Sequence, residues 1–95
     1  MDEKEKLPVS VKEIILSFIG ILSETGWEYM GLIANKITGK IHKDMDEAKL
    51  AIDTIDVLFE KIKDKLEDKE IRDIEKLIDD LKINYVMQLN EKGDK

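Results

Sequence analysis

The sequence predicts an all-α fold in which a long apolar first helix packs against an antiparallel hairpin of two further helices. Three observations lead to this prediction. Capping signals open each segment, apolar residues recur at helical spacing, and the 95 residues include only five glycines and one proline. The chain is 40% charged and 42% hydrophobic, as is typical of helical proteins rich in Glu, Lys, Ile and Leu.

The first helix is expected to begin at Ser10, because Ser10 and Glu13 have the spacing of a capping box. It either continues to about Lys36 or breaks near Gly26. At about 100° per residue, a continuous helix would have a polar or small-residue sector only about 100° wide. Since almost every other position is apolar, we expect this helix to be buried on most of its circumference.

Two amphipathic helices follow a loop at residues 38–43. Asp44 and Glu47 form a second capping-box-like pair, and Asp68 can cap the third helix. The second helix should end near Leu66, and the short connection that follows implies an antiparallel hairpin. Apolar residues step by three and four, as on a packed helix face, at Ala48, Ile52, Ile55, Phe59, Ile62 and Leu66, then at Ile71, Ile74, Ile78, Leu81 and Tyr85.

The length indicates one helical domain, residues 10–89, with flexible tails at residues 1–9 and 90–95. The absence of cysteine excludes disulfides and Cys-based zinc sites. No signal peptide is visible, and no apolar run reaches the roughly 18 residues of a membrane-spanning helix. We therefore expect a cytoplasmic protein without a transmembrane segment. The many Glu, Lys and Ile residues are also typical of thermophiles.

The net charge of −6 argues against nucleic acid as a partner, because neutralising phosphates requires a basic face. It argues equally against an anionic membrane surface, although local patches can oppose the net sign.

An ordered series of short motifs resembles a family of short bacterial helical proteins that is catalogued only as a domain of unknown function. The resemblance covers half to two thirds of the chain and implies a helical protein without an established activity. The motifs are Thr38-Gly39, Ala48-Lys49, Ile52-Asp53-Thr54-Ile55, the stretch from Lys61 to Lys65, the acidic cap from Asp68 to Glu70, and Leu81-Lys82-Ile83-Asn84-Tyr85-Val86.

No catalytic, cofactor-binding or metal-ligating residue is predicted, and we expect no enzyme activity. The segment from Thr38 to Lys40 lacks two positions of the phosphate loop, so we interpret Gly39 as the C-cap that ends the first helix. His42 lies near two aspartates, but a di-metal site in a helical bundle requires Glu-x-x-His motifs that are absent. We interpret His42 as a solvated loop residue.

An exposed apolar helix is an aggregation hazard, so we expect a homo-oligomer, most simply a dimer. The sequence favours a non-catalytic structural or protein-interaction module that self-associates through its first helix, with an unidentified protein as a further possible partner. The alternative is a small-molecule or lipid-binding helical module, with the same surface lining a cavity. The predicted interface comprises Ile14, Ile15, Phe18, Ile19, Leu22, Trp27, Tyr29, Met30, Ile33, Leu50, Val57, Val86 and Met87.

Overall fold

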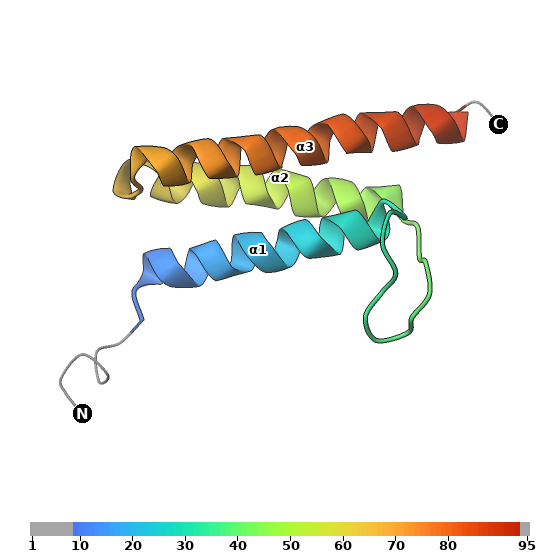
Figure 1. The fold of residues 1–95 in the computed structure, drawn as a ribbon, viewed down its shortest axis with the longest axis horizontal. Coiled ribbons are helices and arrows are strands. Elements are labelled where there is room, and N and C mark those ends of the chain that lie inside the picture. The colour runs from blue at the N-terminus through green and yellow to red at the C-terminus, as the bar shows by residue number, and fades with distance from the viewer. Residues whose placement is uncertain (1–8, 94–95) are drawn as a thin grey trace.

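The computed structural model describes residues 9–93, and these form three α-helices joined by one long and one short connection (Figure 1). The helices are α1 (Val11–Tyr29), α2 (Met45–Ile62) and α3 (Asp68–Gly93), with a 3-10 turn, η2 (Lys63–Lys65), between α2 and α3. Helix α1 packs along α2, and α3 covers another side of α2. The prediction of an all-α fold is confirmed.

Helix α1 begins at the predicted cap. The Ser10 hydroxyl accepts a hydrogen bond of 3.1 Å from the backbone N–H of Glu13, and the Ser10 carbonyl accepts one from Ile14. Both bonds satisfy groups that the first helical turn would otherwise leave without partners. Asp44 caps α2 in the same way, since its carboxylate accepts a bond of 3.2 Å from the N–H of Glu47.

The end of α1 differs from both alternatives that the sequence left open. Gly26 lies inside the helix, and the helix ends at Tyr29 rather than near Lys36. Gly31 terminates it with a φ of +84°, which places its N–H against the Glu28 carbonyl and directs the next N–H to Trp27. This is the hydrogen-bond pattern of a Schellman motif. The interpretation of Gly39 as the C-cap is therefore wrong.

The core lies where the three helices meet. A Cβ placed on Gly26 would lie 3.7 Å from Leu81 and 3.9 Å from Ala51, so residues of α1, α2 and α3 meet at this glycine. The predicted apolar seams of α2 and α3 supply most of the core. Its buried members are Ile19 in α1 and Met30 directly after it, Met45, Ala48, Ile52, Ile55, Phe59 and Ile62 in α2, and Ile74, Ile78 and Leu81 in α3.

Helix α1 is covered on one side only. Within the helix, Ile19, Ser23 and Gly26 are buried, while Val11, Ile14, Phe18 and Ile21 are exposed. The expectation that most of its circumference is buried is therefore not met within a single chain, because the hairpin of α2 and α3 reaches only one face.

Helix α3 continues past residue 89 to Gly93 and extends beyond the start of α2 (Figure 1). Of the tails expected at residues 1–9 and 90–95, residues 1–8 and 94–95 lie outside the described residues, and residues 90–93 belong to α3. None of the described helices combines the length and apolarity needed to cross a membrane.

Candidate interaction site

The structure divides the thirteen predicted interface residues into three groups. Ile19 and Met30 are buried within the chain and contribute to its own core. Ile15, Leu22, Trp27 and Tyr29 are half-buried against that core. The exposed group comprises Ile14, Phe18, Ile33, Leu50, Val57, Val86 and Met87.

The outer face of α1 carries a regular apolar stripe. It consists of Val11, Ile14, Phe18 and Ile21, whose exposed fractions lie between 41% and 69%. The steps of three, four and three residues place these side chains along one line of the helix, as in the seam of a coiled coil. The stripe lies away from the buried Ile19 and Ser23, so the same chain does not cover it. We call it the α1 stripe.

Val11 and Ile21 are absent from the predicted interface, although their spacing from Ile14 and Phe18 was visible in the sequence. The high apolar content of the whole segment concealed this spacing, because nearly every position suited a buried face.

The middle of α1, which carries Ile14, Phe18 and Ile21 of the stripe, is free of charge. The ten residues from Ile14 to Ser23 contain no ionisable side chain, in a chain that is 40% charged. Gly20, beside the stripe, has open space where its Cβ would be. The centre of this surface is therefore both uncharged and open to contact by another chain.

Exposed apolar residues on α2 and α3 form two smaller groups. In α2, Leu50 and Val57 lie one heptad apart on the face opposite the buried seam, beside the Lys49–Asp53 ion pair of 2.7 Å. In α3, Ile83, Val86 and Met87 lie opposite the buried residues of that helix. Neither group forms a stripe as long or as free of charge as the α1 stripe.

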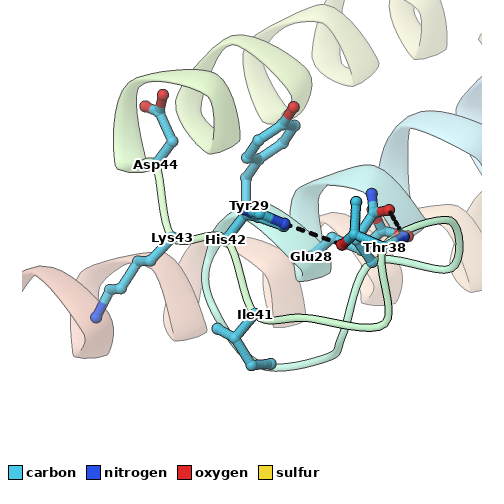
Figure 2. Close-up of a pocket in the computed structure, with 8 residues that line it drawn as sticks. Glu28, Tyr29, Thr38, Ile41, His42, Lys43 and Asp44 are labelled. Atoms are coloured by element: carbon cyan, nitrogen blue, oxygen red, sulfur yellow. Dashed lines mark hydrogen bonds between the residues drawn. The ribbon is translucent and has the colours of Figure 1, made fainter.

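A polar pocket of about 670 Å³ lies under the loop between α1 and α2 (Figure 2). Figure 2 shows His42 pointing toward Thr38, while Lys43, Asp44 and Ile41 point in other directions. The residues that line it are Glu28, Tyr29, Asn35, Thr38, Ile41, His42, Lys43 and Asp44.

Most polar side chains of this pocket already have partners within the protein. The His42 Nε2 lies 2.9 Å from the Thr38 hydroxyl, and the Asn35 amide donates to Glu28 at 3.0 Å. The Lys43 ammonium donates to Gln88 of α3 at 3.0 Å. These bonds hold the loop against the helices. Most polar groups of the pocket are therefore already engaged in maintaining the loop's conformation.

The pair of Thr38 and His42 resembles the nucleophile and base of a hydrolase, but a triad also needs a group that orients the imidazole. Among the described residues no hydrogen bond is made to the second ring nitrogen of His42, and both side chains are exposed. No group of three or more potential metal ligands occurs in residues 9–93. The α1 stripe is therefore the stronger candidate for a functional site.

Comparison with known proteins identifies a family and no individual relative. Residues 12–87 match the family described as a domain of unknown function, DUF1844. No curated protein and no solved structure matches the chain. The resemblance to a family of unknown function is thereby confirmed.

Proposed function

We propose that this chain, which belongs to the DUF1844 family, is a non-catalytic structural module that self-associates through the α1 stripe. The observation that carries the proposal is the exposure of Val11, Ile14, Phe18 and Ile21 at coiled-coil spacing on a helix whose residues 14–23 carry no charge. Large contiguous apolar patches are rare on monomeric proteins and usually mark an interaction site.

Charge restricts where a second copy of the chain could bind. Each copy carries a net charge of −6, so two copies repel one another wherever their charged faces meet. The segment from Ile14 to Ser23 lets two copies approach without bringing like charges together. A contact between the two α1 stripes meets this requirement.

The expected strength of self-association can be estimated from the exposed side chains that it would bury. Fully burying a Val, Ile or Phe side chain contributes about 1.5–3 kcal/mol, so four half-exposed side chains offer roughly 3–6 kcal/mol per copy. Association costs about 4–15 kcal/mol in lost freedom. The gain from two copies is thus comparable with the cost, and we expect a dimer that dissociates on dilution. Half-buried Ile15 and Leu22 beside the stripe would add to the gain.

The test is the molar mass in solution of a Phe18→Ser, Ile21→Ser double variant, measured by light scattering beside the unmodified protein. Both side chains are exposed, so the fold of one chain should survive, and we expect the variant to be monomeric. The matched control is Ile83→Ser on α3, where the side chain is 57% exposed. We expect the control to retain the parent mass.

Two results would oppose this assignment. If the double variant has the same molar mass in solution as the unmodified protein, the α1 stripe is not the interface. If Ile83→Ser lowers the molar mass as much as the double substitution does, the contact involves α3 instead. A monomeric parent that carries an apolar compound, detected by mass spectrometry, would support the alternative of a small-molecule or lipid-binding module.

A further inference from the structure

The connection between α1 and α2 has a charge opposite to that of the rest of the chain. Residues 29–43 contain three lysines and no acidic residue, whereas the other 80 residues hold 22 acidic and 13 basic ones. Lys36 pairs with Glu24, Lys43 bonds to the neutral Gln88, and Lys40 forms no ion pair with any described residue. The nearest carboxylates in sequence, Glu28 and Asp44, lie at the two ends of this connection.

The same connection exposes apolar side chains among its lysines. Ile37 is 93% exposed and Ile41 is 55% exposed, and Leu32 and Ile33 are exposed as well. Figure 1 shows this loop extending away from the three helices at the end of α1. Ile37 can therefore reach a surface that the helices do not contact.

Hydrogen bonds hold the loop in the conformation that exposes Ile37. The Asn35 side-chain oxygen accepts bonds of 2.9 Å from the N–H groups of both Ile37 and Thr38. The Asn35 backbone bonds to Lys40 at 2.9 Å and to Gly39 at 2.8 Å, and Gly39 adopts a φ of +71°. The turn is thus ordered before any contact is made, which lowers the entropy that binding would cost.

We propose that the loop of residues 31–43 docks on an anionic lipid surface, with Ile37 and Ile41 entering the interface and Lys40, which has no ion-pair partner among the described residues, facing lipid phosphates. Binding to a membrane surface strengthens with the apolar area that enters the headgroup boundary and with the attraction of basic side chains to anionic lipids. A protein interface normally needs about 800 Å² from each partner, more than one projecting turn provides. A lipid surface accepts an isolated apolar tip without a matching pocket.

The acidic remainder of the chain opposes this contact, so binding should be weak and should depend strongly on salt and lipid charge. The loop contains none of the four residues of the α1 stripe, and this inference does not depend on the proposed self-association. The two proposals can therefore fail separately.

The experiment is co-sedimentation of the full chain with vesicles at low salt. One set contains phosphatidylcholine alone, and the other contains equal parts of phosphatidylcholine and phosphatidylglycerol. We expect sedimentation with the mixed vesicles only, and loss of most of it at high salt. Ile37→Ser and Lys40→Gln should each lower the bound fraction several-fold. Ile83→Ser and the Phe18→Ser, Ile21→Ser double variant serve as controls and should still bind.

Three outcomes would overturn the proposal: no sedimentation with mixed vesicles at low salt, equal sedimentation with uncharged vesicles, or undiminished binding by the Ile37→Ser variant. Binding of an acidic polypeptide such as polyglutamate to the loop, without binding of vesicles, would also overturn the proposal. The loop would then be assigned to an acidic protein partner.

Discussion

Two glycines in and after α1 have opposite effects on stability. Gly26 is buried inside the helix, and a methyl group there would make ordinary contacts with Leu81 at 3.7 Å and Ala51 at 3.9 Å. Glycine inside a helix costs roughly 0.5–1 kcal/mol relative to alanine. We predict that Gly26→Ala raises the free energy of unfolding by about this amount, as measured by urea denaturation at fixed protein concentration. A loss of stability would show that the helices cannot accept the methyl group.

Gly31, in contrast to Gly26, should not accept alanine without a loss of stability. Its φ of +84° is unfavourable for residues with a side chain, and a Cβ there would lie 3.2 Å from the Lys43 side chain. We predict that Gly31→Ala lowers the free energy of unfolding by about 1–2 kcal/mol. Gly20→Ala is the matched control, since its Cβ would meet nothing and the φ of Gly20 is not positive. Equal effects at both sites would contradict the assignment of Gly31 as the C-cap.

At the residue scale, the start of α1 could be predicted and its end could not. Ser10 and Glu13 form a local pattern with one interpretation. The cap at Gly31 has no such pattern, because Leu32 and Ile33 continue the apolar run and suggest more helix. The end of α1 is set by the positive φ of Gly31, and the amino-acid composition does not reveal this backbone angle.

At the element scale, an ion pair of 2.8 Å between Lys82 and Asp56 links α3 to α2. The hydrogen bond that the Lys82 ammonium donates to Asp56 raises the pKa of Lys82 above its ordinary value of 10.5, and the negative charge of Asp56 adds to the effect. The folded chain therefore holds this proton more tightly than the unfolded chain does. The contribution of the pair to stability is complete below pH 10.5 and is lost as the pH rises through the raised pKa.

We predict that Lys82→Gln lowers the free energy of unfolding at neutral pH by roughly 0.5 kcal/mol, because both side chains are substantially exposed. The difference between variant and parent should shrink as the pH passes the raised pKa of Lys82. Urea denaturation at several alkaline pH values checks this trend. A difference that grows with pH would mean that Lys82 is not stabilised by the carboxylate. Lys76→Gln, which removes a pair within α3, controls for general loss of positive charge.

Helices α2 and α3 could be predicted well because most of their apolar residues form one seam each, and most residues on the other sides are charged or polar. Helix α1 could not be oriented in this way. Ile19 and Phe18 are adjacent and both apolar, yet Ile19 is buried and Phe18 is half exposed. A sequence in which nearly every face is apolar does not indicate which face meets the hairpin, so the two sides became distinguishable only in the folded chain.

At the scale of the whole molecule, the three helices bury a core along one side of α1 and leave the α1 stripe uncovered. The stripe, the exposed residues of α3 and the loop of residues 31–43 consist of different residues, and each can be tested by its own substitutions. The loop combines lysines with isoleucines, a local charge that the net value of −6 conceals. Net charge alone therefore predicted the wrong sign for this part of the surface.

The measurement that tests the central proposal most directly is the molar mass of the unmodified protein, determined by light scattering over a wide range of concentration. Self-association through the α1 stripe predicts a mass approaching at least twice the 11.0 kDa of one chain at high concentration, and a decrease on dilution. A constant mass of 11.0 kDa at every concentration would contradict the proposal.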